Sequence, residues 1–445
     1  MKFVIDKQTL EDLNILGRYK TNSVFNVYNH TVTRGGGLVL ERMFLDPLTD
    51  AGQINFRRDI FEFFQKSKFG FPLSKEEFEL SERYLGNTDN KNMIASYLNN
   101  IKRKAAKLIA NDQEFDLLQE GLTTTISVII KLEAFMGVLQ DVAKSSAYRE
   151  QVENALKILR NKRFNWILTG GKREKYKFWQ FAFYDHKLRY TLSESLSELM
   201  KIVHDLDVYI AVSAIGARRG FVYASANDEE EINIDIKGVY HPCIPDAVSN
   251  DIHLDKHSNV LFLTGANMAG KSTLMKSFGV SLYLAHMGFP LAVKSMTFTV
   301  QNGIYTSINV PDDLNMGYSH FYAEVVRVKK IATEVASGKN LIVMFDELFK
   351  GTNVKDAYDA TVAVTEAFSK IHECVFIVST HIMEAGLTLK ERCKNIKFKY
   401  LPTKMNGSVP TYPYVLDEGI SNDRHGMMII NNEKIIEIIR GYKIV

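Results

Sequence analysis

Apolar positions recur with different periods in the two halves of the chain. Between residues 112 and 218 they recur every three to four positions, as in LLQEGLTTTISVIIKLEAFMGVLQDVA, which predicts long amphipathic helices. After residue 240, the short apolar runs NVLFLTG, NLIVMFD and CVFIVST alternate with helical patterns that begin near Lys271 and Val354. Because alternating strands and helices form mainly parallel sheets, we predict an α/β domain preceded by a mostly α-helical region.

The boundaries of these regions follow from changes in local pattern. The first residues mix strand-like pieces and helices around the glycine-rich stretch TRGGGLVLERMF. A switch to acidic, turn-rich and alternating residues in YASANDEEEINIDIKGVYHPC indicates the start of the second domain. We therefore expect a core domain over 1–110, a helical arm over 111–225, an α/β domain over 226–415 and short closing helices over 416–445.

Composition narrows the class of protein. The 445 residues allow two or three domains with full cores, and a formal charge of only +3 means that any attraction to nucleic acid must come from local patches. Three cysteines without a CxxC pair argue against a disulfide framework or a zinc site and fit a reducing compartment, so we expect a cytoplasmic protein. Charges throughout the N-terminus, and the polar or helix-breaking residues inside VSLYLAHMGFPLAV, argue against secretion and against a membrane span.

A phosphate-binding pattern follows the first apolar run. It has the form G-x-x-x-x-G-K-[ST] between a strand and a helix, and its residues are Gly265, Ala266, Asn267, Met268, Ala269, Gly270, Lys271, Ser272 and Thr273. The glycines let backbone N–H groups turn inward around phosphates, and the start of the helix adds its positive end. Lys271 is expected to reach the β- and γ-phosphates of ATP, and Ser272 to ligate Mg²⁺.

A carboxylate pair ends the second apolar run. In NLIVMFDELFKGTN, Asp346 is expected to bind Mg²⁺ and Glu347 to act as the general base for water. The third run, CVFIVST, is followed by His381, which is placed to sense the γ-phosphate or to orient water. An acidic pair is often a solvated turn and a histidine is often only a surface residue, but the flanking strands favour the catalytic interpretation.

A polar segment lies between the first and second of these motifs. In INVPDDLNMGYSHFYAEVVRV, residues 308–328, a Gly-x-Ser opens into an amphipathic helix, so Ser319 and the helix start offer an anion site. ATPases of the ABC type use such a segment to cap the γ-phosphate of ATP bound to a partner subunit. We therefore expect a homodimer with composite ATP sites, in which Ser319 acts on the ATP of the other protomer.

Together these motifs resemble those of the MutS family of DNA mismatch-repair ATPases. PDDLNMGYSHFYAEV is similar to the family's D-D/N-L-x-x-G-x-S-T-F, with His320 at the usual Thr, and TGANMAGKST to T-G-P-N-M-G-G-K-S-T, with Ala266 and Ala269 as substitutions. FDELFKGTN resembles D-E-x-x-x-G-T-S, and STHIMEAG resembles the A-T-H segment. GVYHPCIPDAVSNDI resembles a segment of the family that precedes the phosphate loop and whose end lies near the adenine of ATP; here Tyr240 replaces an arginine. Residues 22–64 resemble the start of the family's core domain.

The resemblance implies an ABC-type P-loop ATPase domain over 226–415, preceded by a core and lever region, with dimerisation helices at 416–445. It implies ATP and Mg²⁺ as cofactors, DNA as a partner, and a dimer that ATP binding clamps and hydrolysis releases. Because the core begins almost at the first residue, we expect no mismatch-reading domain. Because less chain lies between the core start and the phosphate loop than a full lever pair and clamp would occupy, we expect a reduced or missing clamp. Mismatch specificity is therefore not supported, and branched or otherwise structured DNA, or an RNA-related complex, is the expected substrate.

A basic and aromatic segment stands where a clamp is expected. It reads KILRNKRFNWILTGGKREKYKFWQFAFYDHKLRY, residues 157–190. Cationic side chains neutralise phosphates and aromatic rings stack on unpaired bases, so Lys172, Arg173 and Lys175 are candidates for phosphate contacts. In the alternative interpretation, the aromatic residues close the core at the end of the arm and the charges are merely solvated.

Two other functions fit the same sequence. One is a dimerising ATP switch that binds protein partners through its arm; the other is a repair protein whose mismatch reader is a separate subunit. Salt-dependent binding to duplex, branched and single-stranded DNA distinguishes the switch from a DNA-binding ATPase, because phosphate contacts give affinity a steep salt dependence.

Overall fold

The computed structural model divides the chain into two compact units. One, called the sheet unit, comprises 1–27, 44–58 and 218–445, and the other, called the helical unit, comprises 28–43 and 59–217. The residues that the structure describes are 2–17, 22–86, 114–170, 176–309, 320–406, 409–421 and 435–441. The four regions expected from the sequence, with boundaries after residues 110, 225 and 415, stay a prediction.

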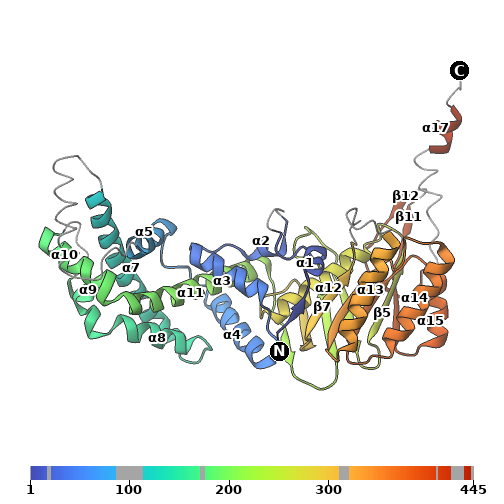
Figure 1. Cartoon of the computed structure of the whole chain (residues 1–445), viewed down its shortest axis with the longest axis horizontal. Coiled ribbons are helices and arrows are strands. Elements are labelled where there is room, and N and C mark those ends of the chain that lie inside the picture. Colours follow the sequence, from blue (N-terminus) through green and yellow to red (C-terminus); the bar gives the residue numbers. More distant parts are fainter. Residues whose placement is uncertain are drawn as a thin grey trace. The chain divides into compact units, whose positions relative to one another are not determined.

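The larger sheet of the sheet unit has seven strands in the order β1-β7-β8-β9-β5-β10-β13. Two of these strands, β5 and β7, are labelled in Figure 1. Their bounds are β1 Val4–Ile5, β5 Val260–Gly265, β7 Gly303–Ser307, β8 Leu341–Asp346, β9 Val375–Ser379, β10 Ile396–Leu401 and β13 Asp417–Glu418. Every neighbouring pair is parallel except β10 with β13. The parallel sheet predicted from the alternating pattern is therefore confirmed.

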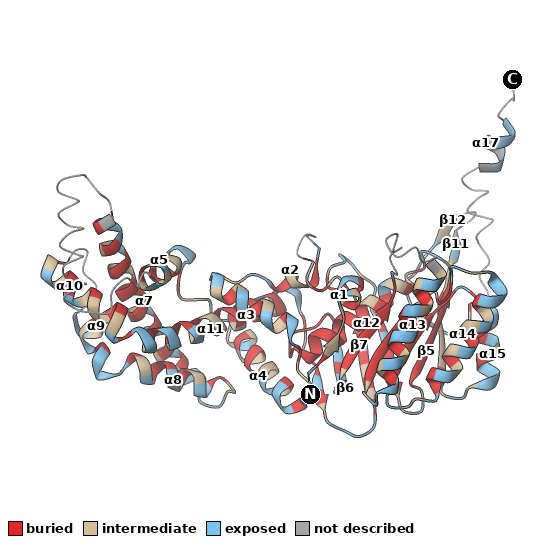
Figure 2. Cartoon of the chain, in the orientation of Figure 1, coloured by how far each residue is buried: buried red, intermediate tan, exposed pale blue. Residues whose placement is uncertain are grey.

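Helices of the sheet unit pack against this sheet. They are α12 Lys271–His286, α13 His320–Ala336, α14 Val354–Ser369 and α15 Met383–Arg392. All residues of β5, β7 and β9 are buried, and α12 is almost entirely buried too, whereas α13, α14 and α15 keep exposed faces (Figure 2). Strands covered on both faces read as continuous apolar runs, which explains why the sequence shows no alternation in them.

A second sheet has four strands in the order β2-β6-β3-β4. They span β2 Ser225–Asn227, β3 Asn233–Val239, β4 Asn250–Asp255 and β6 Ser295–Thr299, and a separate hairpin joins β11 Lys404–Asn406 to β12 Val409–Thr411. Buried and more exposed residues alternate along β4, as expected for a strand with one covered face. Two short helices of this unit are α1 Lys7–Asp12 and α17 Ile435–Gly441.

The helical unit is built from the long helices that the 3.6-residue period predicts. Its elements are α5 Lys75–Gly86, α7 Glu114–Val142, α8 Arg149–Leu159, η1 Lys162–Phe164, α9 Asn165–Gly170, α10 Phe178–His186, η2 Lys187–Thr191 and α11 Ser193–Arg219. The chain passes between the units within α2 Val24–Tyr28, α3 Arg34–Leu45 and α4 Ala51–Ser67. Apolar side chains of α5, α7, α8 and α11 form one continuous core.

Within the described part of the chain, α7 alone has the length and apolar composition that a membrane-crossing helix needs. Half of its most apolar stretch is buried inside the structure. Its buried residues, among them Leu122, Ile129 and Leu132, belong to the core of the helical unit. This burial is typical of a core helix.

The glycine-rich stretch at the start of α3 permits a close approach to α11. A Cβ on Gly35 would lie 2.2 Å from the His204 ring, and one on Gly36 would lie 2.5 Å from Oδ2 of Asp207. The buried Asp207 carboxylate accepts hydrogen bonds from the backbone N–H groups of Val32 and Thr33, at 2.9 and 2.7 Å. Burial raises the pKa of Asp207, although these hydrogen bonds oppose the rise. Thr33 caps the N-terminus of α3, because its hydroxyl oxygen accepts a hydrogen bond from the Gly36 N–H at 2.9 Å, and Asp207 holds Thr33 in place by accepting from that hydroxyl at 2.7 Å.

Candidate nucleotide-binding site

The phosphate loop connects β5 to α12 through residues in left-handed backbone conformations. Gly265 and Gly270 have φ of +143° and +100°, and a Cβ on Gly265 would lie 2.8 Å from the Leu401 carbonyl oxygen. Met268 adopts a φ of 74°, which is uncommon for a residue with a side chain. The loop therefore needs glycine at both ends. It leads directly into α12, whose first backbone N–H groups can donate hydrogen bonds to an anion.

Lys271 is held inside this loop. Its side chain is buried, and Nζ donates hydrogen bonds to the carbonyl oxygens of Gly265 and Ala266, at 2.8 and 3.1 Å. Burial lowers the pKa of Lys271, while the carboxylates of Glu347 and Asp346 oppose this shift. Phosphate oxygens are stronger acceptors for an ammonium group than carbonyls, so a bound phosphate can take over these hydrogen bonds.

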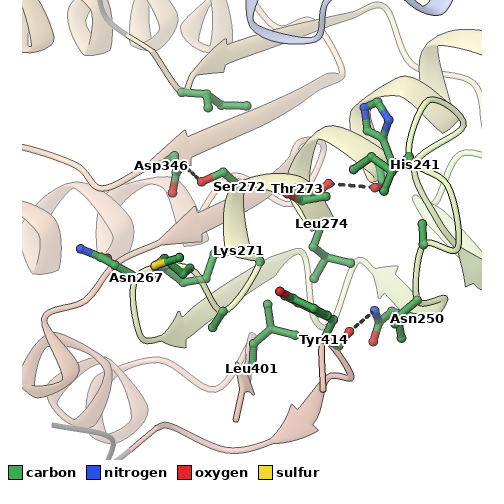
Figure 3. Close-up of a pocket in the computed structure, with 18 of the residues that line it drawn as sticks. His241, Asn250, Asn267, Lys271, Ser272, Thr273, Leu274, Asp346, Leu401 and Tyr414 are labelled. Carbon is green, nitrogen blue, oxygen red and sulfur yellow. Dashed lines mark hydrogen bonds between the residues drawn. The ribbon is translucent and has the colours of Figure 1, made fainter. Parts of the chain in front are cut away.

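Ser272 and Asp346 face each other beside the loop. The Ser272 hydroxyl donates a hydrogen bond to Oδ2 of Asp346 (Figure 3). Oδ1 of Asp346 is buried and has no hydrogen-bond partner among the described residues. Mg²⁺ binds oxygen ligands and commonly uses one or two carboxylates with water and phosphate, so this hydroxyl and unpaired oxygen fit Mg²⁺. No group of three His, Cys, Asp or Glu side chains that could hold a metal occurs among the described residues.

Glu347 directly follows β8 in a strained conformation. Its φ is 53°, and its N–H donates a hydrogen bond to the Ser379 carbonyl at 2.9 Å. Such strain at a non-glycine residue persists only where the surroundings enforce it, and it is concentrated at functional sites. His381 lies close by, with Nδ1 3.8 Å from Oε1 of Glu347, and more than half of its side chain is exposed. The structure thus brings the predicted base and the predicted sensor together.

Lys271, Ser272, Asp346 and Glu347 line one cavity of about 720 Å³ in the sheet unit. One end contains the phosphate loop, Asp346 and Glu347, and the other end is lined by Val239, His241, Ile244, Asp246, Val248, Asn250 and Tyr414, of which Asp246 alone is an acidic side chain. Burial, aided by the charge of Lys276, lowers the pKa of His241 to about 4, so this imidazole is neutral near pH 7. The cavity therefore combines an anion-binding end with a largely uncharged end, and its volume suits a nucleotide.

Sequence reasoning missed Tyr414, which lies beside the phosphate loop. A Cβ on Gly270 would lie 3.0 Å from the Tyr414 ring. Asn250 holds this segment, because its Nδ2 donates to the Tyr414 carbonyl at 2.9 Å (Figure 3). Its Oδ1 also accepts from the Leu416 N–H at 2.7 Å. The one available signal was that Asn250 lies near the end of the stretch GVYHPCIPDAVSNDI, whose end is expected near the adenine, because no motif surrounds Tyr414 itself.

Several predicted site residues lie outside the described residues. These are Ser319, in the segment 310–319, and the three basic residues Lys172, Arg173 and Lys175. The helix expected after the Gly-x-Ser is present as α13, which begins at His320. The roles assigned to these four residues stay predictions.

Comparison with known proteins identifies the family. Residues 261–440 match the model of MutS domain V, and residues 8–213 match the model of MutS domain III. The DNA mismatch repair protein MutS of Leuconostoc mesenteroides is 25 % identical over 89 % of this chain and 56 % of its own length, and that of Rickettsia bellii is 25 % identical over 91 % and 55 %. The Thermus aquaticus protein of the same name is 32 % identical over 46 % of this chain and 24 % of its own length.

The chain thus spans about half the length of the curated relatives that it matches over most of its own residues. The two domain models cover separate parts of the chain, and each coincides with motifs that resemble the same family. The chain therefore belongs to the MutS family and contains its domains III and V in that order.

Proposed function

We propose that the chain hydrolyses ATP to ADP and phosphate in the cavity beside the phosphate loop, within an ABC-type P-loop fold. Domain V is the ATPase domain of the family. The observation that carries the proposal is the buried, unpaired Oδ1 of Asp346 next to the Ser272 hydroxyl, at the N-terminus of α12. Mg²⁺ held there would neutralise charge on the β- and γ-phosphates.

The reaction uses the side chains around that point. Lys271 exchanges its two carbonyl acceptors for oxygens of the β- and γ-phosphates. Glu347 accepts a proton from the water whose oxygen attacks the γ-phosphorus, and the bond to ADP breaks as the new bond forms. His381, 3.8 Å from Glu347, orients this water.

The largely uncharged end of the cavity binds the base of ATP. Tyr414 offers an aromatic face next to the phosphate loop, and Val248 and Ile244 offer apolar surface. His241 adds a neutral ring, because its pKa is about 4. These contacts favour a flat, uncharged group at this end.

In this proposal the functional form is a cytoplasmic homodimer. Ser319 caps the γ-phosphate of ATP bound to the other protomer, so ATP binding clamps the dimer and hydrolysis releases it. The partner is DNA, and branched or otherwise structured DNA is preferred over a mismatch. The support is membership of a family whose curated members are named DNA mismatch repair proteins, and the basic composition of segment 157–190.

Phosphate release by the full chain tests the enzymatic part. Lys271→Ala should abolish Mg²⁺-dependent release, whereas Lys355→Ala, which changes an exposed lysine of α14, should not affect it. Unchanged hydrolysis in Lys271→Ala refutes the proposed site. DNA binding is measured separately, with and without a non-hydrolysable ATP analogue, and a chain that binds no DNA at low salt is better explained as an ATP switch for protein partners.

A further inference from the structure

One face of α10 in the helical unit presents two large aromatic side chains to solvent. Trp179 is 62 % exposed and Phe183 is 41 % exposed. They are four residues apart, so they lie on the same side of the helix. Lys187, in η2, continues this side, with Nζ 4.6 Å from the centroid of the Phe183 ring. These three residues are called the α10 face.

A second aromatic layer adjoins the α10 face. Trp166 stacks on Tyr184, with ring centroids 4.3 Å apart and planes inclined by 6°. Nζ of Lys187 is also 5.7 Å from the centroid of the Trp166 ring. The ammonium group is thus positioned next to two rings, and both tryptophans of the chain lie in this one region.

The opposite side of α10 is anchored in the core of the unit. Phe181 is fully buried and meets Phe115 edge to face, with centroids 5.1 Å apart. The buried Asp185 accepts a hydrogen bond from the Tyr84 hydroxyl at 2.8 Å and pairs with Arg189 at 3.4 Å. Burying an ion pair is favourable only with good geometry and additional hydrogen bonds, which Tyr84 helps to supply. The buried contacts of Phe181 and Asp185 therefore fix the position of α10 in the helical unit.

Positive charge is concentrated in the segment of the sequence that contains this face. Segment 157–190 contains ten Lys and Arg and two Asp and Glu, a net charge of +8, whereas the whole chain has +3. One of the two acidic residues is the buried Asp185, which is already paired. The described residues that contribute exposed cations include Lys157, Lys162, Arg163 and Lys177. The rest of the chain is therefore net negative, and segment 157–190 carries the positive charge that attracts polyanions.

We infer that the α10 face stacks on unpaired bases of a single-stranded nucleic acid, while the surrounding cations contact its phosphates. Single-strand sites combine basic grooves with aromatic platforms, and each stacked base contributes to affinity without regard to sequence. A protein partner fits less well, because lysine is depleted in protein interfaces. Duplex bases are already stacked on each other, so the duplex gains only the phosphate contacts. This inference rests on the nucleic-acid binding proposed above and gives it a substrate class.

Fluorescence anisotropy with the full chain tests the inference. The probes are a labelled oligothymidylate and a labelled duplex of equal length, each titrated at low salt. Trp179→Ala combined with Phe183→Ala should weaken oligothymidylate binding by about 5- to 100-fold and leave duplex binding within about twofold. Trp179→Phe in place of Trp179→Ala should recover part of the lost affinity for oligothymidylate. Phe56→Ala, which removes an aromatic residue that is 47 % exposed in the sheet unit, is the matched control and should have no effect.

Tryptophan fluorescence gives a second measurement that does not depend on the alanine variants. Oligothymidylate should quench the emission of Trp166→Phe, in which Trp179 is the remaining tryptophan, and should not quench Trp179→Phe to the same extent.

Each adverse outcome has a distinct meaning. If the double alanine variant loses equal affinity for the single strand and the duplex, or loses no affinity for the single strand, the inference of base stacking is wrong. The proposed phosphate contacts and the proposed ATPase activity do not depend on that result. A wild-type chain that binds neither probe overturns the proposed DNA function as well, and phosphate release then shows whether the enzymatic part survives.

Discussion

The carboxylate of Asp12 accepts a hydrogen bond from the Thr306 hydroxyl at 2.7 Å, although 294 positions separate the two residues. The same buried carboxylate accepts hydrogen bonds from the backbone N–H groups of Ile308 and Asn309, at 3.0 and 3.2 Å. Asp12 ends α1, and Thr306 lies in β7. The N-terminal residues of the chain therefore hold the backbone that leads from β7 toward the Gly-x-Ser segment.

Replacement of Asp12 should impair both stability and hydrolysis. In Asp12→Asn the charge is lost and an amide NH₂ replaces one acceptor oxygen, so at least one buried donor loses its partner. We expect a loss of about 1–3 kcal/mol in the free energy of unfolding, measured by urea titration. ATP binding should persist while phosphate release falls. Glu11→Gln, at the exposed neighbouring position, is the control, and a stability equal to wild type in Asp12→Asn would show that the network is dispensable.

His286 should make stability depend on pH. It is fully buried, its Nε2 accepts from the Gln301 N–H at 3.0 Å, and its Nδ1 lies 2.8 Å from the Leu282 carbonyl, to which it donates. Burial lowers the pKa of His286 to about 4, although the hydrogen bond to the Leu282 carbonyl opposes the shift.

As the pH falls below about 6.5, the unfolded chain takes up a proton at this position before the folded chain does. The stabilising contribution is therefore complete above pH 6.5 and is lost progressively down to pH 4. Between pH 7 and pH 5 the loss should be about 2 kcal/mol in the free energy of unfolding. His286→Gln should flatten this slope, whereas His372→Gln, at an exposed position, should keep it. Equal slopes in wild type and His286→Gln would contradict the assignment.

Glu347→Gln should separate ATP binding from hydrolysis. The substitution keeps the shape of the side chain but removes the proton acceptor, so phosphate release should fall by about 100-fold or more. The affinity for a fluorescent ATP analogue should stay close to that of wild type. Glu373→Gln, at an exposed position in the same unit, is the control. A Glu347→Gln chain that retains most of its hydrolysis would assign the base to another group.

Tyr414 should contribute to nucleotide affinity through its ring. Tyr414→Ala removes the aromatic face beside Gly270 and should raise the KM for ATP by about tenfold with a smaller change in kcat. Tyr414→Phe keeps the ring and should behave as wild type. If Tyr414→Phe is as defective as Tyr414→Ala, the hydroxyl carries the effect and stacking does not.

Ser319 should act across the dimer. Ser319→Ala should abolish hydrolysis and spare nucleotide binding, because the serine is expected to contact the ATP of the other protomer. A mixed dimer of Lys271→Ala and Ser319→Ala chains should recover at most one working site out of two. Single-turnover phosphate release from mixed and unmixed preparations measures this. Full inactivity of the mixture would argue for a site completed within one protomer.

The motifs around the phosphates were readable in the sequence because their geometry is local. A glycine-bounded loop between a strand and a helix sets its own backbone path, and a carboxylate at the end of a parallel strand reaches the same sheet edge wherever its strand pairs. Lys271, Ser272, Asp346 and Glu347 could therefore be chosen from spacing and pattern, and the structure places them around one cavity.

Sequence alone determined the alternating strands and helices, the long helices and the phosphate loop, since each depends on neighbours within one or two turns. Only the tertiary structure decided that Tyr414 lies beside Gly270, that Asp12 holds the end of β7, and that Trp179 stays exposed while Phe181 of the same helix is buried. Those relationships depend on which distant segments of the chain pack together, and the periodicity of apolar residues within a segment carries no information about that packing.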